Sequence, residues 1–380
     1  MRKHKWLRVL LTVILVILLA AIVAAIVLVG TGRAAKMLEE RGITFLSKKE
    51  TVETADTAST EIAGTETAPA EETAAEAATA ETAAEGEEAA AEETVEEAPV
   101  LMIGDKQVNY GVTFTKTPAT QTPAEGEITS KNCVLINLSD DTIVVANGEE
   151  DRISPASMTK VLTLLCVSEY ILPDNPGPVT ITDDMINYCL SNGLSAAGFE
   201  NGKAYSVRDL MYGAILPSGG EAVAALVVSG GDTMEEFVEL MNNQLTSYGL
   251  SDTAHFTDPS GLYDENHYCT LTDIAAVMKA ALVSDAAREV LSTKVYTIPA
   301  TEEGKEDLVL SNWFLRNIED KDSGGEVIAA KTGFVTQSGY CAVSYEVSAS
   351  GTPYICVTAN SDSEINCIND HVALYKKYAV

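Results

Sequence analysis

The pattern of apolar and polar residues divides the chain into three stretches. From Val9 to Gly30 nearly every residue is Leu, Val, Ile or Ala, a run long enough to cross the hydrocarbon core of a bilayer as a helix. Residues 51–100 are low-complexity Ala, Thr and Glu without apolar periodicity. From residue 128 to residue 380, strand-like and helix-like spacings of apolar residues return. We therefore expect a membrane span over 9–30, a polar linker over 51–100 and one folded domain over 128–380.

Within the folded stretch, the predicted elements are a hairpin, a block of helices, three more strands and a last helix. Capping boxes at Ser206–Asp209 and Thr233–Glu236 predict two of the helix starts. The other elements are predicted at 132–138 and 142–146 (the hairpin), 157–170 and 271–282 (helices), 326–332, 339–347 and 353–359 (strands) and 364–378 (helix). This order predicts an α+β fold, with one antiparallel sheet flanked by helices and a helical subdomain.

The residues beside the first apolar run predict its orientation. Residues 1–8 form a tail with four Lys and Arg residues, which keep that end in the cytoplasm. A cleaved signal peptide is the alternative, but the run is longer than an ordinary signal, and 30–35 offers only weak cleavage sites. We therefore expect a single-pass anchor in the cell membrane, a juxtamembrane segment over 31–50 and an extracytoplasmic folded domain.

Charge adds to this organisation. The chain carries a net charge of −31, and residues 51–100 hold fifteen acidic residues and no Lys or Arg. Such a segment cannot bury a core, so it is predicted to be a disordered, self-repelling tether. Residues 101–127, which contain Pro118 and Pro123, are predicted to be transitional. The acidic folded stretch argues against a nucleic-acid partner.

The cysteines and histidines predict no metal site. The seven cysteines have no CxxC spacing and form no Cys/His cluster. Several lie in apolar predicted strands, where Cys acts as a small hydrophobic residue, so we expect mostly buried free thiols. The four histidines have no spacing typical of a metal site or a Ser-His-Asp triad. We therefore expect neither a metal nor another cofactor.

Candidate chemistry begins with Ser157 and Lys160. Their spacing places both side chains on one face of the predicted helix, close enough for a hydrogen bond. A desolvated lysine with a lowered pKa can accept the proton of a serine nucleophile, and free N–H groups at a helix start can face a developing oxyanion. By itself the SxxK motif is weak, since many helices contain it with the serine as a plain N-cap.

A second motif, Lys331-Thr332-Gly333, lies in a late predicted strand. The lysine and threonine supply a cation and a hydroxyl for a carboxylate, and the glycine lets a substrate approach the backbone. Taken alone, the motif is an ordinary strand end with a solvated lysine. SxxK at a helix start followed by KTG on a late strand is far more specific, because the combination is typical of class A β-lactamases and penicillin-binding proteins.

Residues 128–380 resemble the serine D-alanyl-D-alanine carboxypeptidases, the low-molecular-mass penicillin-binding proteins. The resemblance extends to the residues around SxxK (Pro155–Lys160), the stretch His255–Leu262 and Gly339–Cys341 after KTG. It implies that Ser157 attacks the carbonyl between two terminal D-alanines of a peptidoglycan stem pentapeptide and that Lys160 takes its proton. Water then releases the acyl group. It also implies that β-lactam antibiotics acylate the same serine.

The resemblance implies roles for the remaining motif residues. Ser218 relays a proton to the departing D-alanine. Lys331, Thr332 and Gly333 form the substrate-binding strand, on which the lysine and threonine hold the terminal carboxylate. The backbone N–H groups of Ser157 and Phe334 form the oxyanion hole.

One position departs from the family. Its second motif is Ser-x-Asn, whereas this chain has Ser218-Gly219-Gly220, so the amide that binds the substrate backbone is missing unless Glu221 covers for it. The alternatives are therefore an endopeptidase or transpeptidase of the same superfamily, since acceptor choice depends on pocket shape, or a non-catalytic penicillin-binding wall protein. A class A β-lactamase would carry Ser-Asp-Asn and a deacylating Glu. The expected partners are stem peptides, β-lactams and the membrane.

Overall fold

The computed structural model describes residues 100–109, 112–302 and 304–380. The predicted membrane span at 9–30, the segments on either side of it and nearly all of the predicted tether lie outside these described residues. Among the residues described, no helix combines the length and the apolar composition that crossing a bilayer requires.

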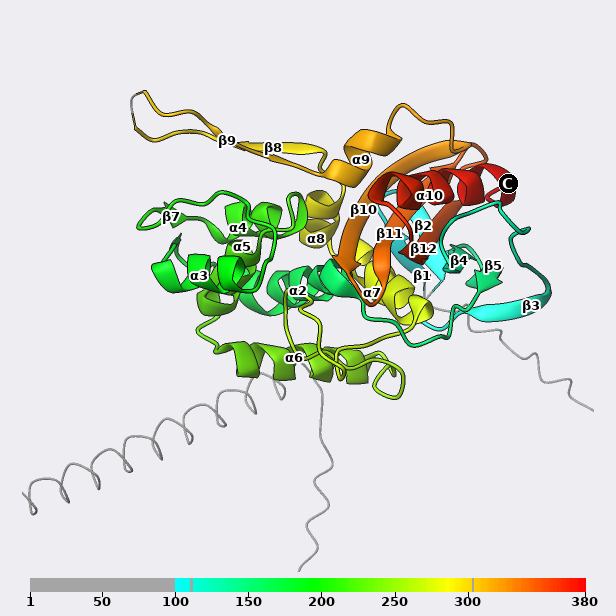
Figure 1. Cartoon of the computed structure of the whole chain (residues 1–380), viewed down its shortest axis with the longest axis horizontal. Coiled ribbons are helices and arrows are strands. Elements are labelled where there is room, and N and C mark those ends of the chain that lie inside the picture. Colours follow the sequence, from blue (N-terminus) through cyan, green and yellow to red (C-terminus); the bar gives the residue numbers. More distant parts are fainter. Residues whose placement is uncertain (1–99, 110–111, 303) are drawn as a thin grey trace, which may run out of the picture. The chain divides into compact units, whose positions relative to one another are not determined.

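A six-stranded sheet forms the middle of the domain, in the order β10-β11-β12-β4-β5-β3 (Figure 1). Its strands are β3 (Thr115–Gln121), β4 (Asn132–Asn137), β5 (Thr142–Asn147), β10 (Gly325–Val335), β11 (Gly339–Ser348) and β12 (Pro353–Ser361). All neighbouring pairs are antiparallel except β3 and β5, which run parallel. The α+β class is confirmed, but the sheet is mixed, so the prediction of a purely antiparallel sheet is wrong at this edge.

The sequence of β3 explains why the parallel edge escaped prediction. Its residues are exposed or half-buried, so the continuous run of buried residues that marks β4, β11 and β12 is missing. Pro118 has no N–H to donate, which an edge strand tolerates. With the hairpin β1 (Val100–Ile103) and β2 (Lys106–Asn109), β3 lies in the segment 101–127 that was predicted to be transitional.

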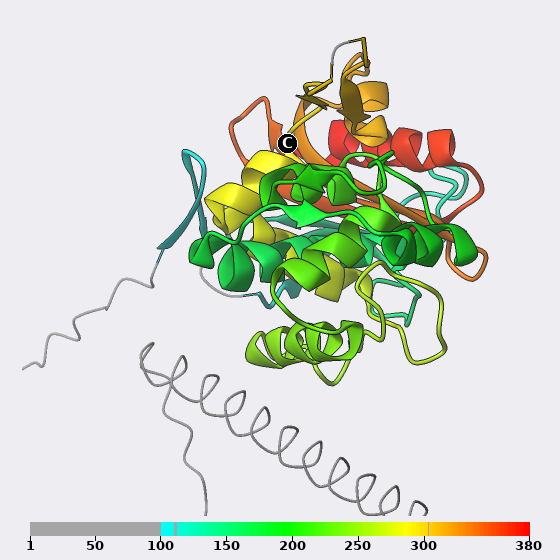
Figure 2. The same ribbon diagram turned by 90° about the vertical axis from the view of Figure 1, so that its left-hand side faces the viewer.

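Most of the helices between β5 and β10 form a subdomain beside the sheet, which Figure 2 brings to the front in green. They include α3 (Asp183–Ser191), α4 (Val207–Ile215), α5 (Gly220–Ser229) and α6 (Met234–Ser247). The short strands β6 (Val179–Thr180) and β7 (Ala204–Tyr205), which lie before and after α3, pair antiparallel, and β8 (Val295–Ile298) pairs with β9 (Leu308–Ser311) in a hairpin. Both predicted capping boxes form, at Ser206 and Thr233. Helix α5 is buried from Gly220 to Val227, as expected for an apolar helix enclosed by others.

The first long helix differs from its prediction. A single α-helix was expected over 157–170, but the chain forms a 3₁₀ turn, η1 (Ala156–Thr159), then α2 (Lys160–Cys166), a π turn, η2 (Val167–Ile171), and a second 3₁₀ turn, η3 (Leu172–Asp174). In a 3₁₀ turn, residues three apart lie directly above one another. Ser157 and Lys160 are therefore stacked more closely than on a regular α-helix.

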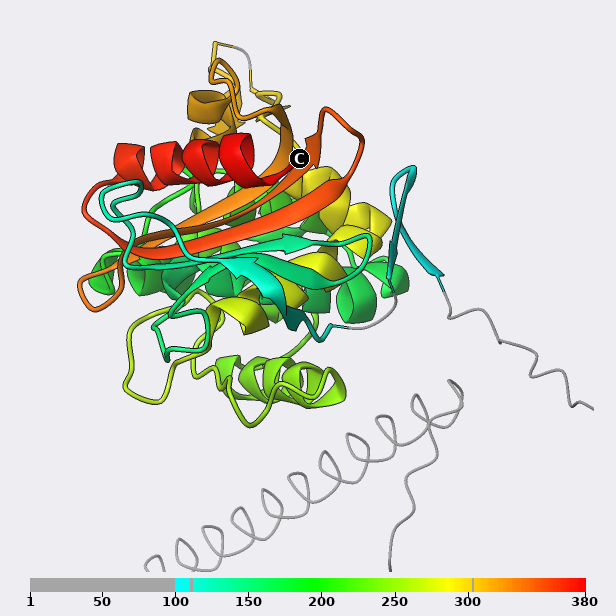
Figure 3. The ribbon, with the colours of Figure 1, turned by 90° about the vertical axis from the view of Figure 1, so that its right-hand side faces the viewer.

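The two faces of the sheet carry separate cores. In β4, Val134 and Ile136 join the main core, whereas Cys133 and Leu135 pack with Leu374 of α10. Helix α10 (Glu364–Tyr378) lies across one face beside α9 (Trp313–Ile318), and α7 (Leu271–Val283) covers the other, followed by α8 (Asp285–Leu291) (Figure 3). All seven cysteines are buried and free, which confirms the prediction of buried thiols.

Candidate active site

The candidate nucleophile and base lie within hydrogen-bond distance. The Nζ of Lys160 donates to the Oγ of Ser157 over 2.9 Å and to the carbonyl oxygen of Ser260 over 2.7 Å. The side chain of Lys160 is fully buried. Burial lowers the pKa of Lys160 to about 8, although the nearby Asp258 carboxylate acts in the opposite direction. A lysine in this state can accept the proton of the serine hydroxyl near neutral pH.

Close backbone packing fixes the nucleophile. Ala156 has a left-handed backbone (φ 49°), a strained conformation for a residue with a side chain. Gly261 is also left-handed, and a Cβ there would collide with the carbonyl oxygen of Ala156. On the other side, a Cβ on Gly333 would lie 3.0 Å from the backbone nitrogen of Ser157. The KTG glycine thus lets β10 pass directly beside the nucleophile, next to Phe334.

A hydrogen-bond network supports the pair from behind. The Asp258 carboxylate accepts from the N–H and the hydroxyl of Ser260, and from the hydroxyl of Tyr188 over 2.7 Å. Burial alone would raise the pKa of Asp258, but these donors outweigh it and hold the pKa below its usual value. The network fixes the loop in which the carbonyl oxygen of Ser260 accepts the hydrogen bond from Lys160 Nζ.

The second buried lysine belongs to the KTG motif. The Nζ of Lys331 donates to the Oγ of Ser218 over 3.0 Å and to the carbonyl oxygen of Thr332 over 2.8 Å. Burial, and then the charge of Lys160, lower the pKa of Lys331 well below its ordinary value. Ser218 has a left-handed backbone (φ 66°) at the turn before α5. An anionic group bound here would restore the charge on Lys331.

These side chains meet in a cleft of about 290 Å³. It is lined by Ser157, Gly193, Leu194, Ser195, Ser218, Thr332, Gly333, Phe334, Tyr340, Cys341, Glu364 and Cys367. The structure therefore brings together the predicted residues of all three motifs. Ser157, Ser218 and Thr332 line the cleft, and the buried Lys160 and Lys331 donate hydrogen bonds to Ser157 and Ser218.

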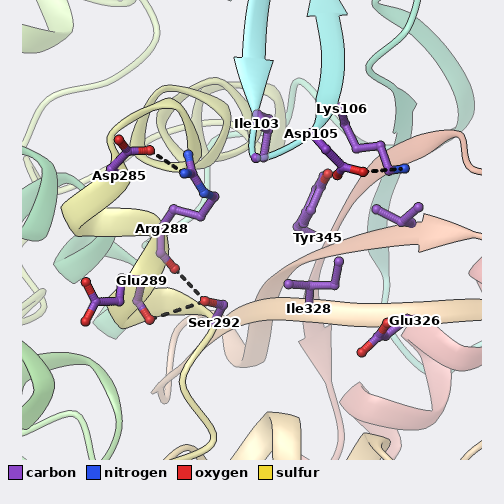
Figure 4. A pocket seen from close by; sticks show the side chains of 12 residues that line it. Ile103, Asp105, Lys106, Asp285, Arg288, Glu289, Ser292, Glu326, Ile328 and Tyr345 are labelled. Carbon is purple, nitrogen blue, oxygen red and sulfur yellow. Dashed lines mark hydrogen bonds and ion pairs between the residues drawn. The ribbon is translucent and has the colours of Figure 1, made fainter.

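A larger cavity of about 630 Å³ lies elsewhere, between the β1–β2 turn, α8 and the strands β10 and β11 (Figure 4). Its Arg288 donates to the carboxylate of Asp285 and to the carbonyl oxygen of Leu282. Its Lys106 donates to the Asp105 carboxylate and its Ser292 donates to the backbone carbonyl oxygens of Arg288 and Glu289, so the two are not hydrogen-bonded to each other as Lys160 and Ser157 are. The acyl-transfer chemistry expected from the motifs therefore belongs to the smaller cleft.

A family model described as D-alanyl-D-alanine carboxypeptidase matches residues 117–363. The chain belongs to this family. The carboxypeptidase DacF of Bacillus subtilis is 27% identical over 214 residues, which make up 56% of this chain and 52% of DacF. The D-alanyl-D-alanine carboxypeptidase of Streptomyces sp. strain K15 is 28% identical over 238 residues, 61% of this chain and 80% of that protein.

A solved structure of a single-site mutant of the Streptomyces strain K15 DD-transpeptidase has the same fold. Its TM-score is 0.60 at 25% identity, and the match covers 67% of this chain and 99% of that one. The chain spans about half the length of several curated relatives that it matches, DacF among them.

The position where the family has asparagine is closed to a side chain in this member. Gly220 is the first residue of α5, and its N–H donates to the carbonyl oxygen of Ser195 over 2.8 Å. The sequence left open whether Glu221 replaces the missing amide, and the structure shows that its carboxylate is engaged elsewhere. Its Oε1 turns away and accepts from the N–H groups of Ala197 and Gly198.

Several residues at the site carry no signal in the sequence. Tyr188 comes from α3, and Leu194 and Ser195 come from the loop that follows it. None of them belongs to a recognisable motif. Asp258 and Ser260 lie in the family-like stretch 255–262, which could have marked them as residues near the site.

The buried histidines are structural. The Nδ1 of His267 accepts from the N–H of Thr257, and its Nε2 lies 2.8 Å from the Oγ1 of Thr159. Burial lowers the pKa of His267 to about 4. His371, on α10, lies between Ser344 of β11 and Thr358 of β12. Both imidazole rings join separate segments of the fold by hydrogen bonds. Among the described residues, no cluster of His, Cys, Asp and Glu could hold a metal ion.

Proposed function

We propose that this chain is a serine D-alanyl-D-alanine carboxypeptidase that removes the terminal D-alanine from peptidoglycan stem pentapeptides. The observation that carries the proposal is the 2.9 Å hydrogen bond between Lys160 and Ser157 in a cleft that the KTG strand also lines. Ser157 Oγ attacks the scissile carbonyl carbon while its proton passes to the neutral Nζ of Lys160. The N–H groups of Ser157 and Phe334 receive the oxyanion.

The leaving group departs on the side of Ser218. When the C–N bond breaks, the nitrogen of the D-alanine takes the proton of the Ser218 hydroxyl, and the proton that Lys160 took from Ser157 replaces it, so Lys160 is neutral again. Lys331 and Thr332 bind the terminal carboxylate. Water then attacks the acyl-enzyme and gives up a proton to Lys160, and Lys160 returns it to the Oγ of Ser157 as the ester bond breaks. A β-lactam carries a carboxylate next to its reactive carbonyl group and acylates the same serine.

Labelling of the full-length chain with a fluorescent penicillin tests the acyl-enzyme. Wild type should bind the label covalently, and Ser157→Ala should not. Ser139→Ala, in the exposed β4–β5 turn, is a matched control that keeps labelling. D-alanine release from a stem pentapeptide then tests turnover. Failure of wild type to take up the label would refute the proposal, and labelling without D-alanine release would leave a penicillin-binding protein without turnover.

A second candidate is transfer of the acyl group to an amine. The solved structure of a related protein is described as a DD-transpeptidase, which supports this alternative. Adding glycine or a D-amino acid to the pentapeptide assay separates the two reactions. Both reactions release one D-alanine, but hydrolysis leaves a free tetrapeptide, whereas transfer leaves a tetrapeptide joined to the acceptor by a new amide bond. A product ratio that follows acceptor concentration would favour the transpeptidase.

We also propose that residues 9–30 anchor the protein in the cell membrane and that residues 51–100 tether an extracytoplasmic domain to it. The support is the apolar run, its basic flank and the acidic composition of the linker. Deleting 51–100 should leave pentapeptide hydrolysis in solution unchanged and alter action on intact cell wall. Loss of hydrolysis in solution, or penicillin labelling confined to the soluble cell fraction, would contradict this arrangement.

A further inference from the structure

Gly220 of the second motif has no room for a side chain in this structure. A Cβ on Gly220 would lie 2.7 Å from Cδ1 and 2.9 Å from Cβ of Leu194, and 3.2 Å from Sγ of Cys189. The Cβ of Leu194 moves only with its backbone, so a different rotamer would not make room. An asparagine at position 220 therefore cannot be accommodated while Leu194 is in place.

Leu194 is held there by a set of contacts to the second motif. The carbonyl oxygen of Ser195 accepts from the N–H of Gly220 over 2.8 Å and from the thiol of Cys189 over 3.3 Å. Two residues further on, the N–H groups of Ala197 and Gly198 donate to the Glu221 carboxylate over 2.6 and 2.8 Å. We call residues 193–198 the docked segment.

Gly219 also contributes to this docking. A Cβ on Gly219 would lie 2.6 Å from the Cβ of Ala197, so this glycine leaves room for the docked segment as Gly220 does. Glu221 is almost completely buried in the first turn of α5, where a carboxylate is favoured by the helix dipole. Three consecutive residues, Gly219, Gly220 and Glu221, thus form the receiving surface for one loop.

The docked segment delivers side chains to the cleft. Gly193, Leu194 and Ser195 line it, opposite Thr332 and Phe334. Leu194 is half-buried and Ser195 is exposed. The wall from which the family presents a carboxamide therefore presents an isobutyl group and a hydroxyl group here.

We propose that Leu194 and Ser195 are the specificity-determining residues of this enzyme for the acyl part of its substrate, and that Gly220 and Glu221 serve to dock them. Leu194 offers apolar contact, and the Ser195 hydroxyl gives or accepts one hydrogen bond with the peptide backbone. The substrate class that fits is a peptide with small apolar residues before the scissile bond. This inference rests on the proposed carboxypeptidase function.

A steric double-mutant cycle in the full-length chain tests the docking. Gly220→Ala should lower Tm by several degrees and slow acylation by a fluorescent penicillin about tenfold or more, because the added Cβ displaces Leu194. Leu194→Gly combined with Gly220→Ala should restore most of the Tm loss that Gly220→Ala causes. Gly177→Ala is the matched control, since a Cβ there meets nothing within 4 Å. If Gly220→Ala behaves like Gly177→Ala, the docking is refuted.

Substrate kinetics test the recognition role. Ser195→Ala should raise KM or lower kcat/KM for the pentapeptide about threefold to tenfold with Tm unchanged, as expected for the loss of one hydrogen bond. Ser191→Ala, on the exposed end of α3, is its control. Leu194→Ala should lower kcat/KM most for substrates with an apolar residue before the scissile bond. Unchanged kinetics in both variants would overturn the assignment.

The two proposals fail in different ways. If wild type takes up no penicillin, the proposed function is refuted, while the Tm values of the Gly220 and Leu194 variants still report whether the loop is docked. If wild type is labelled and turns over the pentapeptide but the Leu194 and Ser195 variants match it, only the specificity assignment is lost.

Discussion

The two walls of the cleft are built in different ways. The wall of η1 and β10 keeps the family's SxxK and KTG motifs, and its reacting groups are fixed by contacts between them, such as the approach of Gly333 to the backbone of Ser157. The opposite wall keeps Ser218 but has lost the family's asparagine, and the docked segment fills the space. The groups that act on the reacting atoms and bind the terminal carboxylate are present, whereas the asparagine that would bind the substrate backbone is replaced by Gly220.

The difference follows from what each wall must do. A base must lie within hydrogen-bond distance of its nucleophile with a suitable pKa, which leaves little freedom in residue type or spacing. A recognition surface can gain contacts from apolar area, hydroxyl groups or amides in many combinations. Mutations in the first wall should therefore have larger effects than mutations in the second.

The largest effect is expected for Lys160→Met. Removing the base should slow acylation by penicillin about 10²- to 10⁴-fold, the range typical of general-base catalysis. Tm should stay level or rise, because the methionine replaces a buried cation with apolar volume. Lys279→Met is the matched control: this lysine is also buried, but it pairs with Asp141 over 2.7 Å and lies outside the cleft. The control should lose stability and keep its labelling rate, and equal rates for both variants would contradict the role of Lys160.

The acylation rate should also depend on pH through Lys160. Its pKa of about 8 makes the neutral, proton-accepting form scarcer by about tenfold for each pH unit below 8. The second-order rate constant should thus rise with pH and level off above about 8, as stopped-flow labelling can follow. The same shift makes the unfolded chain bind more protons between pH 8 and 10.5, so this group's contribution to the free energy of unfolding rises across that window. A rate that falls between pH 6 and 8 would contradict a neutral lysine base.

Lys331→Met should weaken binding of the pentapeptide substrate. Losing a charge-assisted hydrogen bond of about 1.5–3 kcal/mol raises KM for the pentapeptide about 10- to 100-fold. The decisive comparison uses a peptide with its terminal carboxylate converted to an amide. Wild type should bind the amide peptide poorly, and Lys331→Met should raise KM for it only a little further. If the substitution raised KM equally for the carboxylate and the amide peptide, Lys331 would not act on the terminal carboxylate.

The smallest effect is expected on the recognition wall, for Glu221→Gln. The amide keeps one oxygen for the N–H groups of Ala197 and Gly198 but removes the charge, so kcat/KM should fall only a few-fold and Tm by a few degrees. Glu326→Gln, an exposed carboxylate on β10, is the control. A loss as large as that of Lys160→Met would mean that the two walls are not separate in function.

Sequence patterns predicted the elements that carry strong periodicity. Strands β4, β11 and β12 alternate between two buried faces, and α10 begins and ends where its apolar pattern does. The exposed strand β3 and the hairpin β8–β9 bury little apolar surface, so they leave no such pattern. The 3₁₀ turn at Ser157 depends on the left-handed Ala156, which packing against Gly261 imposes from about a hundred residues away.

The candidate site was predictable where it rests on motifs. Ser157, Lys160, Ser218 and Lys331 meet as expected, because each lies in a motif whose order along the chain is diagnostic. The consequence of Gly220 was not predictable. It depends on Leu194, which no spacing links to the motif and which only the packing of the loop after α3 brings there.

The pairing of β12 with β4 has a consequence for how the protein is made. Residues 354–359 pair with 132–137, so a strand near the end of the chain closes the sheet against one of its first strands. Synthesis delivers the N-terminal part first, and non-local pairing is slow to form. Until β10 and β12 arrive, β4 has only its hairpin partner and Ser157 lacks the strand that passes beside it. A nascent chain therefore carries its serine and lysine well before it can acylate anything, and activity appears together with the completed sheet.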